Sequence, residues 1–327
     1  MLTKVIRQLN RLQWPQHFSF KKAKVISPKT ACLKIDSKEL SIIGMNEMAS
    51  QKELIFNKIE KCEDVIQLNK ILDHWISLYR LAEIPLTWML QSKDYRLLII
   101  DDLLVEPYEL QSAIQLKIKS LIDFPIEDAL IDSFPIPLKK ADISQKKIMV
   151  AVSRISYIQS MLDQLQKSTL QVSTITIPEL GLKNISALYE NDENSNLLIY
   201  LTEGESHLLI TAQKTLYLSR KLEINQALFE PNFENTDTGI HEFNQFILEI
   251  QRSLDYYQSE WRKSTISQIV FASTWPNSQK IMEKLSAQLN IPVKSIIFDD
   301  FFIINENLSL TEQALYLPMI GGILKEE

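Results

Sequence analysis

Adjacent carboxylates are the first side chains in this sequence whose type and spacing suit acid–base chemistry. Asp101-Asp102 and Asp299-Asp300 each follow an apolar run that is typical of a strand. Catalysis by two carboxylates requires both to reach the same substrate, whereas consecutive residues at a strand end point to opposite faces. Aspartate is also common in turns, where its side chain bonds the nearby backbone. The two pairs therefore predict turns and no catalytic dyad.

Histidine and cysteine, the usual metal ligands and nucleophiles, occur without the spacing of a site. The histidines have no HxxxH or HExxH partner, and Cys32 and Cys62 form no CxxC pair. Metal and redox sites require such spacing, and a G-x-S-x-G nucleophile turn is also absent. We expect no metal and no catalytic residue, in a chain typical of a reducing compartment. The histidines are His17, His74, His207 and His241.

Glycine, which phosphate-binding loops need, is scarce. The 327 residues contain 6 glycines, about 2% where an average protein has about 7%. Loops that wrap a phosphate use glycine so that backbone amides can come close to the ligand. Neither G-x-G-x-x-G nor G-x-x-x-x-G-K occurs. The sequence therefore lacks a conventional nucleotide loop.

Composition places the chain among ordinary globular proteins of about two domains. Hydrophobic residues make up 45% and charged residues 23%, with a net charge of −6, so we expect neither disorder nor a nucleic-acid partner. No apolar run is long enough to cross a bilayer, and the N-terminus lacks a signal-peptide layout. These features predict a cytoplasmic protein.

The first 24 residues form a basic amphipathic arm. They contain six lysines and arginines and no acid, and Leu2, Val5, Ile6 and Leu9 fall on one helical face. Such an arm suits an anionic membrane surface. The alternative is a helix that packs on its own domain.

Strands and helices alternate along the rest of the first half. Two strands, at about 24–35 and 39–45, flank the polar turn Asp36-Ser37-Lys38 and predict a hairpin. An apolar stripe over 51–81 predicts a helix that can break near Cys62. Further strands are expected at 86–90, 95–101, 129–131, 147–152 and 172–177, with helices at about 107–124, 156–166 and 178–189.

The second half repeats this layout without repeating the residues. The polar run NDENSN at 191–196 is the best domain boundary, and the segment 230–239 is expected to be polar and mobile. The layout of hairpin, helix, strand, helix and strand indicates an internal repeat within a mixed α/β fold. The predicted strands are 197–201, 206–211, 215–222, 266–272 and 293–298, and the helices are 243–261, 279–289 and 311–325.

Several segments in a fixed order resemble one family. The central stretch reads EPYELQSAIQLKIKSLIDFPIEDALIDSFPIP, and it is followed by IMVAVSRISYIQSMLDQLQKSTLQVSTITIPELGLKNI, EIQRSLDYYQSEW, IVFASTWPNSQKIMEKLSAQLNIPV and IGGIL. From about Val25 to the C-terminus this order resembles the PilM-like proteins of type IV pilus machines, and most closely the MshI type of MSHA pilus assembly.

The resemblance implies an actin-like (RNase H-like) α/β fold of two domains with an inserted subdomain. The first domain would span 25–190 with the insertion at about 103–142, and the second 191–327, whose final helix could return to the first domain.

The nucleotide positions that the resemblance implies depart from those of ATP-binding relatives. Ser27 and Pro28 stand where an aspartate and a glycine are expected in the first hairpin, and Tyr200 and Thr202 in the second. The adenosine turn, FASTW, has no glycine. Hydrolysis requires a Mg²⁺ carboxylate and amide-rich turns, so ATP turnover is not expected. ATP binding stays open through a residual set of Ser27, Lys29, Thr30, Thr202, Ser273 and Gly321.

The resemblance favours an interaction protein over an enzyme. In the family, the cytoplasmic tail of an inner-membrane partner (PilN-like, or MshJ-like in MSHA systems) docks between the first subdomain and the insertion. The chain would then lie at the inner face of the inner membrane through its partners. The alternative is an actin-like protein that binds or hydrolyses ATP to drive assembly. Candidates for the partner groove are Tyr108, Leu110, Ile114, Phe124 and Pro125.

Overall fold

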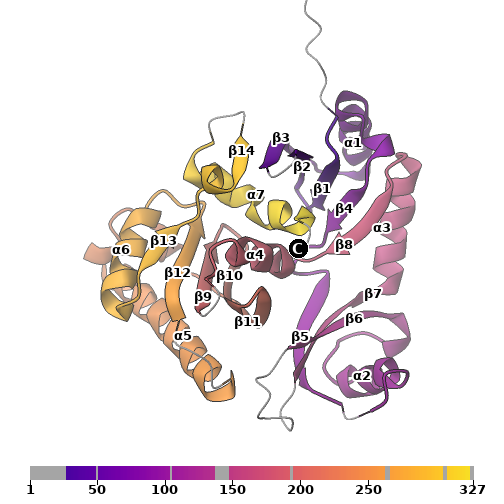
Figure 1. Ribbon diagram of the computed structural model, residues 1–327. Helices are drawn as coiled ribbons and strands as arrows, with labels where there is room; N and C mark the ends of the chain where they lie inside the picture. Colours follow the sequence, from indigo (N-terminus) through magenta and orange to yellow (C-terminus); the bar gives the residue numbers. More distant parts are fainter. Residues whose placement is uncertain are drawn as a thin grey trace, which may run out of the picture.

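The computed structural model describes residues 27–48, 51–103, 105–136, 147–191, 194–261, 266–304 and 308–324. The strands within them form one six-stranded, one five-stranded and one three-stranded sheet, with helices between and around them (Figure 1). The predicted α/β class is confirmed. The basic arm of residues 1–24 lies outside the described residues.

The first sheet is a meander of three antiparallel strands, extended by two parallel strands on one side and by a short parallel strand on the other. Its strand order is β14-β3-β2-β1-β4-β8, with β1 antiparallel to β2 and parallel to β4. The predicted first hairpin is confirmed, since Ile35 pairs with Leu40 across the turn. The strands are β1 (Thr30–Ile35), β2 (Glu39–Met48), β3 (Gln51–Lys61), β4 (Leu86–Met89), β8 (Val172–Thr176) and β14 (Phe302–Ile304).

The second sheet repeats the same internal order. Its order is β11-β10-β9-β12-β13. A meander of three strands, β9 to β11, is again extended by two parallel strands, which lie beside β9, the first strand of the meander. The repeat predicted from the layout of the elements is therefore present in the topology. The strands are β9 (Ser195–Leu201), β10 (Ser206–Ala212), β11 (Thr215–Lys221), β12 (Ile266–Ser273) and β13 (Val293–Ser295).

A separate three-stranded antiparallel sheet is inserted between β4 and α3 (Ile155–Lys167). It contains β5 (Tyr95–Asp101), β7 (Lys147–Arg154) and β6 (Ala129–Ile136) in that order, covered by α2 (Leu110–Ile118). Ile114 and Ile118 of α2 pack against the sheet with Ile100 and Val150. We call this unit, residues 95–154, the insertion, because its first and last strands in the sequence, β5 and β7, pair with each other.

Helices cover both large sheets. Buried residues of α1 (Val65–Tyr79) and α3 pack on the first sheet, and those of α5 (Asp237–Trp261) and α6 (Ser278–Leu289) on the second. Figure 1 shows α4 (Pro178–Ala187) and α7 (Leu310–Ile323) crossing between the two sheets. The last helix thus contacts both halves of the chain, with its residues close to β1, β4 and β12.

The prediction of one helix over 51–81 is wrong in its first third. Residues 51–61 form β3, which pairs with β2 along almost its full length, and the helix begins only at Val65 after the capping residue Asp64. The apolar positions of this segment fit either a strand or a helix. Pairing with β2 decides the outcome because it satisfies backbone groups that would otherwise lie at a sheet edge.

The prediction that 230–239 is a mobile connection is also wrong. Phe233 is buried and its ring packs against Phe243, with 5.7 Å between the centroids. Asn277 donates hydrogen bonds of 3.1 Å to the carbonyl oxygens of Leu228 and Glu230. The segment is polar in composition, but the buried ring of Phe233 holds it in place.

The strand predicted at 293–298 is shorter than expected. It ends at Ser295, and the chain then turns and forms β14, which pairs with β3 of the first sheet. The sequence pattern gave no signal for this return.

Candidate functional site

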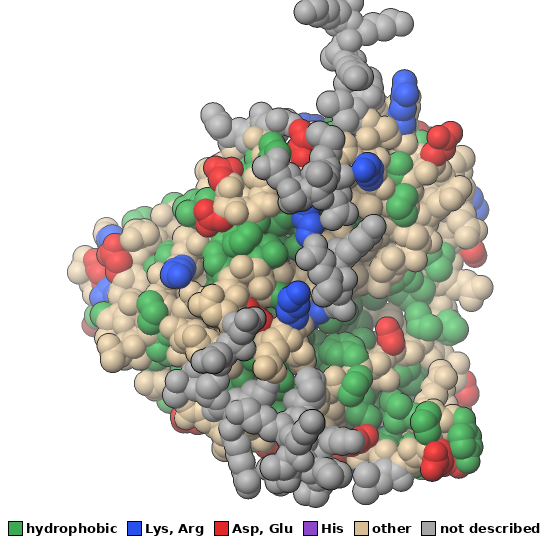
Figure 2. Space-filling model, viewed as in Figure 1, with side chains coloured by type: hydrophobic (Ala, Val, Ile, Leu, Met, Phe, Trp, Pro, Cys, Tyr) green, Lys and Arg blue, Asp and Glu red, His purple; other side chains and the backbone are tan. Residues whose placement is uncertain are grey.

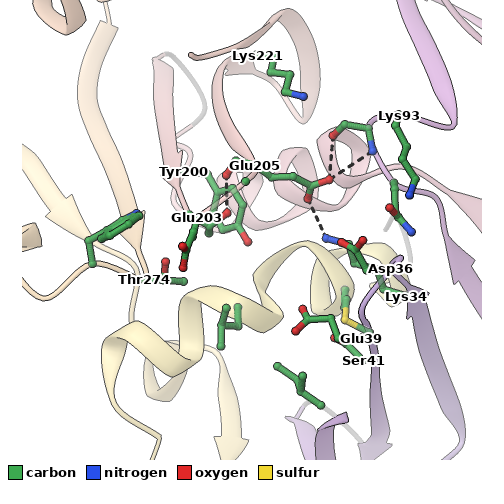
Figure 3. Close-up of a pocket in the computed structure, with 18 residues that line it drawn as sticks. Lys34, Asp36, Glu39, Ser41, Lys93, Tyr200, Glu203, Glu205, Lys221 and Thr274 are labelled. Atoms are coloured by element: carbon green, nitrogen blue, oxygen red, sulfur yellow. Dashed lines mark hydrogen bonds and ion pairs between the residues drawn. The ribbon is translucent and has the colours of Figure 1, made fainter. Parts of the chain in front are cut away.

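A cleft opens between the two large sheets where the carboxyl ends of their central strands meet. We call it the central cleft (Figure 3); its volume is about 520 Å³. The first sheet contributes the β1–β2 turn and the residues after β4, and the second contributes the β9–β10 turn and the residues after β12. The side chains that the argument uses are Lys34, Asp36, Glu39, Ser92, Lys93, Thr202, Glu203, Glu205, Lys221 and Trp275.

An ion pair crosses the central cleft. The Lys34 ammonium lies 2.8 Å from Oε2 of Glu205, and both side chains are mostly buried. The other carboxylate oxygen of Glu205 accepts hydrogen bonds from the hydroxyl and the backbone N–H of Ser92, at 2.9 and 3.3 Å. Burial alone would raise the pKa of Glu205, but Lys34 and these donors outweigh it and hold the pKa below its usual value. Glu205 is therefore a stable carboxylate at neutral pH.

Charged side chains of both signs line the central cleft. Three lysines line it, against the four carboxylates of Asp36, Glu39, Glu203 and Glu205. Lys34 is already paired, so the local field is not the positive one that favours phosphate. No group of three acidic, histidine or cysteine side chains suited to a metal ion occurs in the part of the chain that the structure describes.

The predicted nucleotide residues are not brought together. Ser27, Lys29 and Thr30 lie at the amino end of β1, whereas the cleft is at its carboxyl end, about 16 Å away at the rise of a strand. Thr202 lines the cleft, and Ser273 comes just before the lining residues Thr274 and Trp275; its hydroxyl accepts a 3.1 Å hydrogen bond from the backbone N–H of Trp275. Gly321 lies instead at the crossing of α7 and α4.

Sequence reasoning missed Lys34, Asp36, Ser92 and Glu205. The turn Asp36-Ser37-Lys38 was predicted, and placing the ligand positions at this turn, not at the start of β1, would have found the first two. An acid and a glycine do lie at the hairpin turns of this fold, as Asp36 and Gly204. Glu205 follows that glycine, and its pairing with Lys34 has no local sequence signal.

A second hollow lies between the insertion and α3. We call it the insertion groove; its volume is about 550 Å³ and it is lined by residues 93–96, Asp123, Phe124, Arg154, Ser156, Tyr157 and Ser160. The guanidinium of Arg154 lies over the Phe124 ring, 4.9 Å from its centroid. Asp94 accepts a 3.0 Å hydrogen bond from the Tyr157 hydroxyl. The groove thus combines aromatic surface with charged groups of both signs.

The predicted partner residues divide between the groove and the body of the insertion. Phe124 lines the groove, and Pro125 is the next residue. Ile114 is buried in the core of the insertion, and Leu110 packs at its margin. Tyr108 is 80% exposed and does not line the groove. Figure 2 shows hydrophobic side chains on the surface of the insertion, at the lower right of the view.

A buried polar cluster lies beneath the central cleft. Glu179, at the start of α4, accepts a hydrogen bond from the Tyr95 hydroxyl of the insertion. Nδ1 of His207, on β10, lies 3.9 Å from Glu179, and neither ring nitrogen of His207 has a hydrogen-bond partner among the described residues. Burial lowers the pKa of His207, although Glu179 and Glu205 oppose the shift. The cluster therefore holds a neutral imidazole.

Stability is expected to fall as the pH drops below about 6.5, because His207 takes up a proton only when the chain unfolds. The unfolded state then binds more protons than the native state, so this group costs up to about 1.4 kcal/mol per pH unit down to its lowered native pKa. Above about pH 6.5 the contribution vanishes. Urea unfolding between pH 5 and 8 measures the slope. His207→Phe should flatten it, whereas the exposed His74→Gln should not; equal slopes in all three proteins would contradict the assignment.

The comparisons with known proteins identify the fold. No family model and no curated protein sequence matches this chain. A chain of a solved structure titled "PilM-PilN type IV pilus biogenesis complex" superposes with a TM-score of 0.68 at 13% identity, covering 91% of this chain and 99% of the other. The cytoplasmic domain of EpsL, an inner membrane component of the type II secretion system of Vibrio cholerae, gives a TM-score of 0.46 at 11% identity, covering 88% and 92%.

None of the helices that the structure describes is long and apolar enough to cross a membrane. The superposition on the pilus complex covers almost the whole chain, which contains the repeated sheets and the insertion. This chain has the actin-like fold.

Proposed function

We propose that this chain is a scaffold of a type IV pilus assembly platform, of the MSHA type, that binds the cytoplasmic tail of an inner-membrane assembly protein. The partner is of the PilN or MshJ kind, and the chain acts at the inner face of the inner membrane without hydrolysing ATP. The observation that carries the proposal is the fold shared, over 91% of this chain, with a structure whose title names pilus biogenesis and such a partner. The basic arm, residues 1–24, is proposed as an additional contact with anionic lipid.

The insertion groove is the proposed docking site for the tail. Its volume falls within the range of about 300–1,000 Å³ typical of ligand sites. Phe124 gives the groove an aromatic lining residue, and aromatic residues commonly provide much of the binding energy at such contacts. Arg96 is paired with the exposed Asp123 at 3.5 Å, so the rim remains polar, as in other protein interfaces.

The electrostatics of the central cleft support the proposal that the chain does not hydrolyse ATP. Phosphoryl transfer depends on cations and backbone amides that surround the phosphates. In this cleft Lys34 and the Ser92 amide are engaged by Glu205, and further carboxylates stand nearby. The alternative of an ATP-driven assembly protein would require these contacts to open.

Binding of the tail tests the proposal. The probe is a fluorescently labelled peptide with the cytoplasmic N-terminal tail of the PilN-like protein from the same organism. Fluorescence anisotropy in nucleotide-free buffer should show saturable binding to the full chain. A scrambled peptide of the same composition is the control. Failure of the tail peptide to bind more tightly than the scrambled one would reject the scaffold assignment.

A further inference from the structure

Glu205 is held by the set of groups that proteins use to bind an external anion. Its carboxylate meets an ammonium, a hydroxyl and a backbone N–H, which come from Lys34 and Ser92. Such mixed donor sets bind carboxylates and phosphates strongly because the hydrogen bonds are charge-assisted. Figure 3 shows these contacts as dashed lines across the central cleft.

The donors and the acceptor come from opposite sides of the cleft. Lys34 lies next to the last residue of β1 and Ser92 follows β4, so both are on the side of the first sheet, at the strand ends where α/β folds bind their ligands. Glu205 belongs to the β9–β10 turn of the second sheet and lies 171 residues from Lys34 in the sequence. The contact therefore joins the two halves of the molecule.

The β9–β10 turn fixes the position of Glu205. The hydroxyl and the backbone N–H of Thr202 both donate to the Glu205 carbonyl, at 2.5 and 3.1 Å. Gly204 has a φ of +107°, a conformation that side-chain-bearing residues rarely adopt. An ordered turn therefore holds the backbone of Glu205 in a position from which its carboxylate reaches Lys34 and Ser92.

We propose that Lys34 and Ser92 form an anion site whose resident ligand is the Glu205 carboxylate, so that the central cleft is closed by the chain itself and not by a bound phosphate compound. Glu205 is supplied at high effective concentration because it is part of the same chain. An external phosphate must displace it and therefore does not bind the native protein at this site. The site stands whether or not the chain binds the pilus partner.

Removal of the resident carboxylate should make the site available. Thermal unfolding of the full chain is followed in increasing inorganic phosphate, with sodium chloride adjusted to constant ionic strength. Glu205→Ala should melt below the wild type without phosphate and should show a saturable rise of several degrees as phosphate occupies the vacated site. The wild type and the double variant Lys34→Met/Glu205→Ala should show no such saturable rise.

Glu203→Ala is the matched control. Glu203 lies in the same turn and lines the same cleft, so its removal changes the cleft charge equally but leaves Glu205 in place. No saturable phosphate response is expected for this variant. A response equal to that of Glu205→Ala, or none in Glu205→Ala, would overturn the assignment of the site.

A second measurement covers the case in which Glu205→Ala does not fold. Lys34→Met leaves Glu205 without its cation, and amide hydrogen exchange in the β9–β10 turn should then accelerate at least tenfold, while exchange in the insertion stays unchanged. Unchanged exchange in the turn would show that the ion pair does not hold the cleft closed.

Discussion

Gly321→Ala is expected to destabilise the protein by about 1–3 kcal/mol, or more, because overpacked sites of this kind cannot relax freely. A Cβ at Gly321 would lie 1.9 Å from the carbonyl oxygen of Gly181, and a Cβ at Gly181 would lie 2.0 Å from that of Pro318. Both clashes involve backbone atoms, so no change of side-chain rotamer removes them. The helices α4 and α7 must separate, and the side chain of Asn184, which donates a 2.9 Å hydrogen bond to the Gly321 carbonyl, must shift as well.

Gly322→Ala is the matched control for this prediction. A Cβ there would meet only the side-chain ends of Met89 and Thr176, at 3.0 and 3.1 Å. Alanine also favours a helix by about 0.5–1 kcal/mol over glycine, so we expect a change within about 1 kcal/mol of zero. Urea unfolding of the three proteins makes the comparison. Similar stabilities for Gly321→Ala and Gly322→Ala would contradict the close crossing of α4 and α7.

Phe124→Ala is expected to weaken binding of the partner tail at least tenfold, and about thirtyfold if Phe124 is a central anchor worth 2 kcal/mol. The ring lines the insertion groove and supports the guanidinium of Arg154. Loss of the ring removes apolar surface from the groove and also removes the support of the Arg154 guanidinium. Anisotropy titration with the labelled tail measures the change, and thermal unfolding verifies that the variant remains folded.

Tyr108→Ala tests whether the tail binds in the insertion groove or elsewhere on the insertion. Tyr108 is the more exposed aromatic residue, but it does not line the groove, so its removal should leave tail affinity within twofold. Ile114 is unsuitable for this test because it is buried in the core of the insertion. A loss confined to Tyr108→Ala would move the docking site to the outer surface of α2.

The local spacing of apolar residues was sufficient to predict most helices and strands and the internal repeat. The apolar stripe of α5 and the hairpin around Asp36 depend on neighbours in sequence, and both elements are present, although α5 begins at Asp237 and not at 243. Segment 51–61 failed because its apolar spacing suits two structures and only the exposed edge of β2 selects the strand. Strand β14 was not predicted, because its three residues are stabilised by pairing with β3, a contact that the local sequence does not show.

The candidate site was predictable only where it coincides with a turn. Thr202 and Phe124 were candidates because of the family resemblance, and each lines a hollow next to a turn. Lys34 and Glu205 could not be paired from sequence, since 171 residues separate them and each looks like an ordinary strand-end charge. Gly321 was read as a ligand position, whereas the structure gives it a packing contact that composition cannot distinguish from one.

Phosphate release by the full chain, saturated with the partner tail and supplied with Mg-ATP, tests the central claim most directly. We propose that the chain binds a polypeptide in the insertion groove while Glu205 closes the central cleft. We therefore expect phosphate release at the level of buffer alone and a tail affinity that Mg-ATP does not change. Steady phosphate release above that level, lost in Lys34→Met, would contradict it and establish the cleft as a nucleotide site.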